Sequence, residues 1–408
     1  MRDLRRLPVP DRSSREIPSE MLQEILAKLP AKDVARSCGV SRQWRGVASD
    51  PAFRSLHAAS YVAPWADAQV LLIAQTHEPE EASVYSMSSC KPMAMCSVAI
   101  PVEYSLANVC NGLLCFVHRD EAGEPAVVFN PVTGETLAFP RPPPLPTDCI
   151  FALGFSPPTR EYKLFRLSPP FVDVYTLGDA GGWRQRTDLS LPHPDEIMDW
   201  PPQLIDGKLY LLTGDDRVLV VDVSTETCRT YHYPEHRALP PLNYELLGLE
   251  HEAMHLLYPP PVRRPFAMHP FELDGQPCSA VHATGIARGV HFWVMSPPPE
   301  DGRRPQWDLR YSFEIDRPLL SHHYAPSSAW VDDGEMLCYM LGGTLYMYDM
   351  KAHSPPTSSH GGWLPWDQKV NLKEIPLWRK SWECRWNIHG GYRPTFLSPL
   401  VFTLPPSG

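Results

Sequence analysis

Three short helical patterns follow one another within residues 17–56, and none of them is long enough to bury a hydrophobic core by itself. The first places apolar residues at the spacing of one helical face, and these are Leu22, Ile25, Leu26 and Leu29. We expect Ser19 to cap the start of this helix and Pro30 to end it. Something else must therefore cover these helices.

A second pattern spans residues 33–39, and a third spans residues 40–50. Their apolar positions are Val34, Cys38, Val40, Trp44 and Val47. Because the residue before a proline avoids the helical conformation, the pair Asp50-Pro51 predicts the end of the third helix. Beyond this pair we expect only one short turn, over residues 53–56.

The order of these residues resembles the F-box, whose pattern has a Leu-Pro start, a first helix ending in Leu-Pro, a Val followed by Trp-Arg, and a closing Asp-Pro-x-Phe. The matching positions are Ile17-Pro18, Leu22, Ile25-Leu26, Leu29-Pro30, Val40, Trp44-Arg45 and Asp50-Pro51-Ala52-Phe53. The chain departs from the pattern at Ile17, where Leu is usual, and at Cys38-Gly39, where bulkier residues are common. The second departure predicts a weaker contact with the partner of the module.

By this resemblance, the module binds a Skp-type adaptor and through it joins a cullin-RING ubiquitin ligase. The adaptor-binding surface is expected to be apolar and exposed on the free chain. Its residues are Pro18, Leu22, Ile25, Leu26, Leu29, Pro30, Val34, Val40, Trp44 and Arg45. The alternative is a helical hairpin that only packs onto the rest of the protein, with Trp44 in its core.

The composition is that of a folded protein. Hydrophobic residues make up 43% of the 408 residues and aromatic residues 10%, which is enough apolar surface for a large core. No stretch approaches the ~20 apolar residues of a membrane span, and no secretory signal is evident at the N-terminus. The ten cysteines form no C-x-x-C pair, so we expect reduced, mostly buried thiols in a cytoplasmic or nuclear protein without a metal site.

Charge is distributed unevenly along the chain. Residues 1–60 hold 11 Lys and Arg against 7 Asp and Glu, whereas the whole chain has a net charge of -10. An acidic chain of this kind argues against a nucleic acid or an anionic membrane as the partner. The basic N-terminal part suits an acidic adaptor, although such a balance is usually only a solvated surface.

After about residue 65 the pattern changes to short apolar runs separated by Gly, Pro, Asn and Asp, which is typical of β-strands and tight turns. Repeating apolar strands fall at about residues 130, 175, 222, 272, 314 and 349. Units of about 35–50 residues that each hold several strands are typical of propeller blades. The sequence therefore predicts a small all-α module followed by a large all-β, β-propeller-like domain with six blades.

Two stretches of this region resemble the F-box-associated domain of plant F-box proteins, which is similar to kelch-like propellers. They are Asn111-Gly112-Leu113-Leu114 with Phe129-Asn130-Pro131-Val132-Thr133-Gly134-Glu135, and Gly154-Phe155 with Glu161-Tyr162-Lys163-Leu164. The resemblance implies that this domain recruits a target and that residues 391–400 form the strand closing the ring. The expected division is a tail over residues 1–14, an F-box over 15–60 and the propeller-like domain over 61–408.

A different chemistry is suggested by His251, Glu252 and His255, which satisfy the H-E-x-x-H pattern of zinc peptidases. Tyr258 and Pro259 follow where a metzincin would need Gly and a third His, and no third ligand is evident. Flanking apolar runs also predict a β-hairpin here rather than a helix. We treat a zinc peptidase as a remote alternative.

The sequence thus predicts a non-catalytic substrate receptor without a cofactor. The adaptor would be of the Skp type, and the target, which we expect to be a protein, is not identified by the sequence. The second hypothesis is a propeller scaffold or ligand-binding protein whose helices pack only within the chain. Burial distinguishes the two, because no adaptor surface remains if Leu22, Leu26 and Trp44 are covered by the protein's own propeller.

Overall fold

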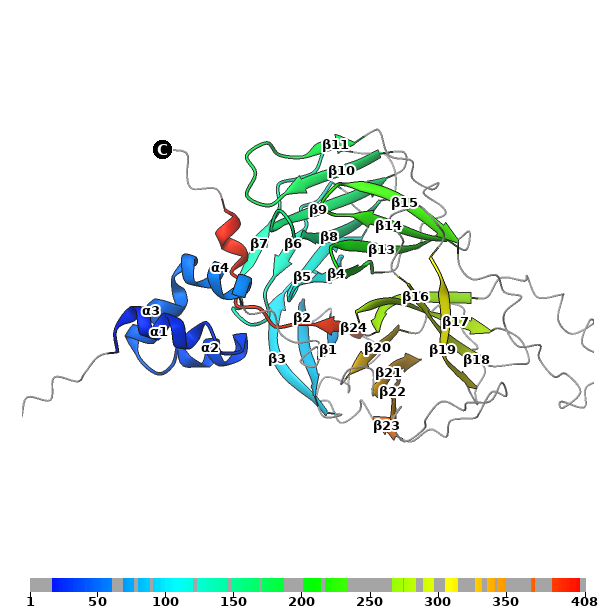
Figure 1. Cartoon of the computed structure of the whole chain (residues 1–408), viewed down its shortest axis with the longest axis horizontal. Coiled ribbons are helices and arrows are strands. Elements are labelled where there is room, and N and C mark those ends of the chain that lie inside the picture. The colour runs from blue at the N-terminus through cyan, green and yellow to red at the C-terminus, as the bar shows by residue number, and fades with distance from the viewer. Residues whose placement is uncertain are drawn as a thin grey trace, which may run out of the picture.

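The computed structural model divides into a helical module and a larger part built from strands (Figure 1). It describes residues 17–60, 69–76, 80–88, 91–119, 123–144, 149–168, 171–186, 201–213, 217–232, 266–273, 275–283, 289–296, 305–314, 327–331, 336–341, 344–349, 368–370 and 384–403. None of the helices in these ranges is long and apolar enough to cross a membrane. The order of elements is the predicted one, with helices first and strands after them.

The helical module consists of α1 (Ser19–Leu26), α2 (Ala31–Ser37), α3 (Arg42–Ser49) and α4 (Pro51–Ser60). The first three helices confirm the predicted patterns. The expected short turn after Asp50 is wrong, because α4 is a ten-residue helix. Pro51 is its first residue, where a fixed φ favours a helix, and the Asp50 carboxylate accepts a hydrogen bond from the Ala52 amide at 2.8 Å.

The first helix also differs at both ends from the prediction. Pro18, and not Ser19, is its N-cap, and no side chain caps it. The helix ends at Leu26, three residues before Leu29, and the backbone then forms tight turns up to Pro30. Pro30 is the N-cap of α2, so it starts the next helix as well as excluding a longer α1.

Within the described residues the strands form six four-stranded antiparallel sheets. The first sheet holds β4 (Tyr104–Cys110), β5 (Leu113–His118), β6 (Val127–Phe129) and β7 (Thr136–Ala138), and the second holds β8 (Ile150–Ser156), β9 (Glu161–Ser168), β10 (Phe171–Thr176) and β11 (Arg184–Arg186). The third holds β12 (Gln203–Ile205), β13 (Lys208–Thr213), β14 (Arg217–Asp222) and β15 (Thr227–His232), and the fourth holds β16 (Phe266–Leu273), β17 (Gln276–Ala283), β18 (Gly289–Met295) and β19 (Trp307–Glu314). The fifth holds β20 (Ser327–Val331), β21 (Met336–Leu341), β22 (Thr344–Asp349) and β23 (Gln368–Val370). The sixth combines β24 (Cys384–Tyr392) with β1 (Gln69–Thr76), β2 (Glu81–Ser88) and β3 (Lys91–Ala99). A short 3-10 helix, η7 (Pro399–Phe402), follows.

The sheets follow one another around a ring. Strand contacts link β4 with β8, β8 with β13, β12 with β16, β16 with β20, β20 with β24, and β24 with β4. These contacts return to the starting sheet, so the inner strands enclose a common axis, as in a β-propeller. The sequence prediction of a β-propeller after a helical module is therefore confirmed.

The sheet that completes the ring takes strands from both ends of this region. β24 pairs antiparallel with β1, and its partners include Leu72 with Ile388 and Thr76 with Cys384. The expected closing strand over residues 391–400 is wrong, because the strand ends at Tyr392. The residues beyond Tyr392 leave the sheet and run to the helical module, where Phe396 packs into its core (Figure 1).

The predicted repeat positions are only partly right. The positions near residues 130, 175, 222 and 349 fall at the third strands of four sheets, β6, β10, β14 and β22. Those near 272 and 314 fall on the first and fourth strands of one sheet, β16 and β19. The sheet containing β1, β2 and β3 has no predicted position at all, because its strands carry no Asn or Asp at the end of an apolar run.

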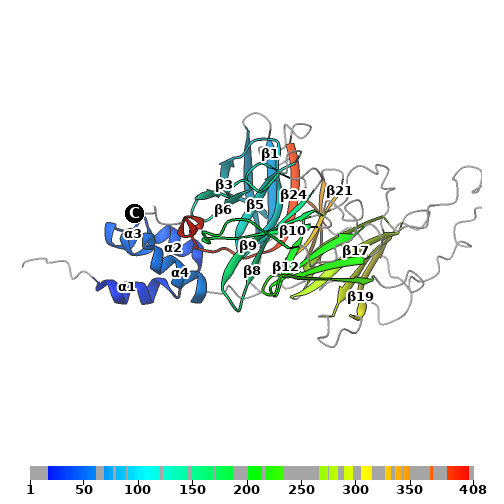
Figure 2. The same ribbon diagram turned by 90° about the horizontal axis from the view of Figure 1, so that it is seen from above.

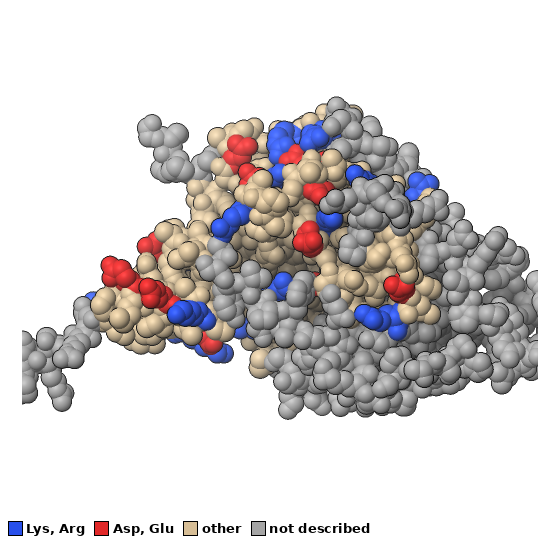
Figure 3. All heavy atoms as spheres, in the orientation of Figure 1, with Lys and Arg blue, Asp and Glu red and all other residues tan. Residues whose placement is uncertain are grey.

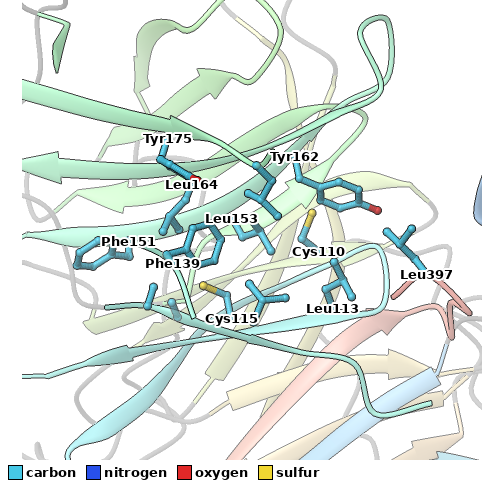
Figure 4. Close-up of a cluster of buried hydrophobic side chains, with 14 residues drawn as sticks. Cys110, Leu113, Cys115, Phe139, Phe151, Leu153, Tyr162, Leu164, Tyr175 and Leu397 are labelled. Atoms are coloured by element: carbon cyan, nitrogen blue, oxygen red, sulfur yellow. The ribbon is translucent and has the colours of Figure 1, made fainter. Parts of the chain in front are cut away.

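Apolar side chains fill the space between neighbouring sheets. Figure 4 shows the cluster between the β4–β7 sheet and the β8–β11 sheet, in which Cys110, Cys115, Leu153 and Tyr162 are buried. Burial raises the pKa of the Cys115 thiol to about 12, so it stays protonated and behaves as an apolar group. Leu397, which follows the last strand, completes this cluster.

Two ion networks are buried within and between the sheets. The Arg166 side chain donates two hydrogen bonds to one Asp173 oxygen, at 2.6 and 3.0 Å, and another to the Pro143 carbonyl at 2.6 Å. Between two sheets, the Glu226 carboxylate accepts hydrogen bonds from Lys163 and Arg184. Burial alone would raise the pKa of Glu226, but these cations lower it to about 2.

Two Trp side chains make the same contact between neighbouring outer strands. The Trp183 indole donates to the Pro140 carbonyl at 3.0 Å, and the Trp307 indole donates to the His232 carbonyl at 3.2 Å. In both cases the Trp lies at or just before the start of the outer strand of one sheet, and the carbonyl lies at or beyond the end of the outer strand of the preceding sheet. The two hydrogen bonds therefore tie adjacent sheets at their periphery.

Replacing Asp173 by Ala should lower the free energy of unfolding of the propeller by about 3–5 kcal/mol, because the Arg166 charge would stay buried without its carboxylate. Urea unfolding measures the change. Arg141→Ala is the matched control, since the Arg141 side chain is 70% exposed in its ion pair with Glu124. A change of more than about 1 kcal/mol in the control, or less than that in Asp173→Ala, would contradict this prediction.

Candidate functional site

The core of the helical module is shared with the rest of the chain. Its buried residues are Leu22, Leu26, Ala31, Val34, Val47, Ala48, Phe53 and Phe396. Phe396 comes from residues 393–403, which we call the C-terminal segment, and Val132 from the turn between β6 and β7 packs against the same cluster. Part of the cover that the helices need therefore comes from the chain itself.

Burial divides the ten predicted adaptor-binding residues into three groups. Leu22, Leu26 and Val34 are 0% exposed, so the expectation that they form an exposed surface is wrong for these three. They lie on the helical faces that pack around the shared core, which is why solvent does not reach them. Leu29 and Trp44 are half-buried at the edge of that core. Whether any of the ten binds an adaptor stays a prediction.

The other five predicted residues are exposed, and these are Pro18, Ile25, Pro30, Val40 and Arg45. Ile25 is 40% exposed and Val40 is 65% exposed. Met21, at 54%, was missed by the sequence reasoning. It lies four residues before Ile25, so the two share one side of α1, and this spacing was the available signal.

Hydrogen bonds fix the backbone around these exposed residues. The Gln43 side chain in α3 donates to the Ile17 carbonyl just before α1. The Arg45 side chain donates to the Cys38 carbonyl at 3.2 Å, and the Ser41 hydroxyl caps α3 by accepting from the Trp44 amide. The start of α1, the end of α2 and the start of α3 are thereby held together. Figure 3 shows acidic and basic side chains side by side on the visible face of this module.

Arg54 in α4 is the main polar link between the helices and the propeller. Its guanidinium donates to both Glu135 oxygens, at 2.6 and 2.9 Å, and to the Ala48 carbonyl at 3.1 Å. It also lies over the Phe396 ring, 5.2 Å from the ring centre. The Arg54 and Glu135 side chains are only 15% and 24% exposed, so solvent screens this pair less than an ordinary surface pair.

The turn over residues 130–135 holds the C-terminal segment on its other side. The Asn130 amide donates to the Thr395 carbonyl at 3.1 Å and to the Leu397 carbonyl at 2.6 Å. Its oxygen accepts from the Val132 amide at 2.8 Å, which shapes the turn. This turn carries the motif that suggested an F-box-associated domain. The turn thus connects the C-terminal segment, the propeller and, through Glu135, the helical module, and we call this contact region the joint. The sequence reasoning missed it, because bonds to residues more than 260 positions away leave no local pattern.

Gly112 shows how closely the C-terminal segment approaches the first sheet. Its φ is +81°, and a Cβ built at this position would lie 2.4 Å from the Arg393 carbonyl oxygen. No other residue type fits both the backbone angle and the contact. The Asn-Gly turn noted in the sequence therefore serves a long-range contact as well as a hairpin.

Burial and hydrogen bonding shift several pKa values in the joint. Burial lowers the pKa of His57, and its hydrogen bond at 2.8 Å to the Leu29 carbonyl only partly opposes this. Burial alone would raise the pKa of Glu135, but hydrogen bonds from Ser398 and Arg54 and the Arg54 charge bring it below the ordinary value. Burial and the nearby Arg36 charge lower the pKa of Lys32, whose ammonium donates to the Gln69 side chain at 2.7 Å.

The residues of the zinc-peptidase alternative, His251, Glu252 and His255, lie outside the described residues. Within the ranges that are described, no group of three or more His, Cys, Asp or Glu side chains is placed to hold a metal ion.

Comparisons with known proteins find matches to both parts of the chain. Residues 15–58 match an F-box-like family, and residues 64–244 match the F-box associated beta propeller domain. An F-box protein of Arabidopsis thaliana is 29% identical over 230 residues, which cover 52% of this chain and 55% of the relative. A second Arabidopsis F-box protein is 27% identical over 257 residues, which cover 53% of each. The chain thus spans about half the length of the curated relatives it matches.

Among solved structures, TolB from Acinetobacter baumannii matches 76% of this chain and 67% of its own length, with 10% identity and a TM-score of 0.40.

Arg54 and Glu135 should stabilise the joint together rather than separately. In a double-mutant cycle with Arg54→Ala and Glu135→Ala, we expect a coupling free energy of about 0.5–3 kcal/mol. Hydrogen exchange of the α4 amides measures the local stability of each variant. The exposed i,i+3 pair Asp33 and Arg36 is the control, for which about 0.5 kcal/mol at most is expected. Equal coupling in the two cycles would contradict this assignment.

The joint should weaken in acid because of His57. Its pKa is lowered by burial, so the open state binds more protons than the closed state once the pH falls below the ordinary value of about 6.5. The contribution of His57 to the stability of α4 is therefore fully present above this pH and is lost progressively as the pH falls below it. In His57→Gln, hydrogen exchange of α4 should depend less on pH between about 7.5 and 5.5. The β24 amides, near buried His389 with its pKa lowered to about 4, should respond alike in both proteins. An unchanged pH dependence of α4 would contradict this role.

Proposed function

We propose that this chain, an F-box protein with an F-box-associated β-propeller domain homologous to Arabidopsis F-box proteins, is the substrate-recognition subunit of an SCF-type cullin-RING ubiquitin ligase. In this proposal residues 15–60 bind a Skp-type adaptor, residues 61–408 bind a protein target, and residues 1–14 are a tail. The chain itself performs no catalysis, and the ligase subunits supply it. It acts in the cytoplasm or the nucleus.

The observation that carries this proposal is the exposed apolar surface on a module that matches the F-box. Met21, Ile25 and Val40 are all at least 40% exposed although the module already buries a core. Met21 and Ile25 lie on one side of α1, and exposed apolar side chains that lie together are typical of an interaction site. The module therefore has an apolar surface available for an adaptor.

The burial pattern suggests different roles for the predicted adaptor-binding residues, some in direct contact with the adaptor and others in support of the helices. In the proposal Pro18, Ile25, Pro30, Val40 and Arg45 contact the adaptor directly, together with Met21. Leu22, Leu26 and Val34 support the helices from below, and Leu29 and Trp44 lie at the edge. Leu26→Asp is for this reason a poor test of binding, since it would place a charge in the core and unfold the module.

The target is proposed to bind at the ring face opposite the helical module, with each of the six sheets acting as one blade. The module contacts the end of the ring at which β6 turns into β7 and β24 ends. Because consecutive strands are antiparallel, each connection from one sheet to the next starts and ends at the other face. Loops on a fixed scaffold are where binding residues are usually found.

One observation favours the second candidate, a propeller scaffold whose helices pack only within the chain. Phe396 and Val132 of the propeller side share the core with Leu22, Leu26 and Val34, so part of the module is already covered. The two candidates differ in whether the exposed residues of α1 bind anything.

Ile25→Asp should weaken binding of a purified Skp-type adaptor by at least about tenfold, because it places a carboxylate in an apolar contact. Calorimetry measures the affinity, and the melting temperature should change little because Ile25 is exposed. Leu309→Asp in β19 is a matched control, since Leu309 is 41% exposed and Ile25 is 40% exposed. No binding by the unaltered chain, or equal binding by Ile25→Asp, would favour the scaffold.

A further inference from the structure

The C-terminal segment runs from the last strand of the ring to the helical module, and both views place it between the two parts (Figures 1 and 2). We infer that this segment fixes the direction in which the adaptor-binding helices face relative to the propeller. The positioning residues are Phe396 of the segment and Arg54 of α4. The inference rests on the proposed function for its biological meaning, and the contacts themselves are independent of it.

On the propeller side, the segment is held along its length. Near its start, the Arg393 carbonyl lies against Gly112, and Asn130 donates to the carbonyls of residues 395 and 397. Leu397 is buried in the cluster between two sheets, where Val401 and Phe402 also pack. The Phe402 ring lies 5.4 Å from the Tyr162 ring. These contacts fix the segment to the first two sheets.

On the module side, the same segment contributes one large side chain and one hydroxyl. Phe396 is 2% exposed, and its ring meets His57 edge-on at 6.0 Å and Arg54 at 5.2 Å. The Ser398 hydroxyl helps to lower the pKa of the Glu135 carboxylate, which accepts hydrogen bonds from Arg54. Because α4 contacts Phe396 of the segment and, through Arg54, Glu135 of the neighbouring turn, it cannot rotate without losing one of these contacts.

The strands next to the segment extend this link to the ring. β24 passes directly into the segment, and β24 pairs with β1. Gln69, the first residue of β1, accepts a hydrogen bond from Lys32 in α2. The two strands that close the ring are therefore both joined to the helical module. The direction of α1, with its exposed Met21 and Ile25, is set by the closed ring.

The consequence for a ligase receptor is geometric. An adaptor bound to α1 would hold a constant direction relative to a target on the opposite face, as transfer to a target lysine requires. A flexible link would instead let the bound target sample many directions. The structure assigns this constraint to side chains of the segment and of α4, away from the exposed residues proposed to bind the adaptor.

The test uses the full-length chain, alone and with a purified Skp-type adaptor. Phe396→Ala should lower hydrogen-exchange protection in α2 and α4 by about 100-fold or more, because it removes a core ring. Glu135→Gln, which leaves the core intact, should lower it by about tenfold. Leu400→Ala is the matched control in the same segment, since Leu400 is 44% exposed, and a change below about threefold is expected.

X-ray scattering supplies the readout that stability alone would not move. In Phe396→Ala the radius of gyration should rise, because the module swings away from the propeller, while strands β8, β9 and β10 keep their protection. Adaptor affinity of Glu135→Gln should stay within about threefold of the unaltered chain. Unchanged scattering, or loss of protection that extends to β8, β9 and β10, would overturn the inference.

The two proposals fail in different ways. If the unaltered chain does not bind the adaptor, the proposed function fails, and exchange and scattering still decide whether the segment positions the module. If the adaptor binds but scattering is the same in all variants, the proposed function stands and the positioning role is wrong.

Discussion

The shared core around Phe396 is the contact on which the arrangement of the two parts depends. Four helices of seven to ten residues cannot exclude water from Leu22, Leu26 and Val34 without another apolar group. Phe396 provides it, and the polar groups around it, Arg54 and Glu135, find partners in each other. Burial of the Phe396 aromatic ring stabilises the contact, and the hydrogen-bonded ion pair between Arg54 and Glu135 restricts its geometry.

The ring provides a second constraint, because no single sheet in it is stable alone. Apolar clusters lie between the closing sheet and the β4–β7 sheet, and between each of the next three neighbouring pairs. In the described residues three of the sheets thus have an apolar cluster on both sides, and the ring closes where β24 joins β1. Because the C-terminal segment extends from β24, closing the ring also brings Phe396 to the helices.

The sequence was sufficient for features that depend on local spacing. Leu22, Leu26 and Val34 marked apolar helical faces, and Asn111-Gly112 and residues 130–135 marked turns. It was insufficient where one pattern has two outcomes: an apolar residue on a short helix is either a core residue or a docking residue, and only the position of Phe396 decides. Pairing of Asn130 with residues 395 and 397 depends on the closed ring, so no window of sequence contains it.

The position of Phe396 near the end of the chain has a consequence for synthesis. The ribosome makes the helices first, yet Phe396, whose side chain completes their core, is added more than 330 residues later, after almost the entire propeller. Until then the nascent helices expose Leu22 and Leu26, and β1 lacks its neighbour β24. A chain that terminates before Phe396 never covers these residues, so the helical module of an incomplete product keeps an uncovered apolar surface.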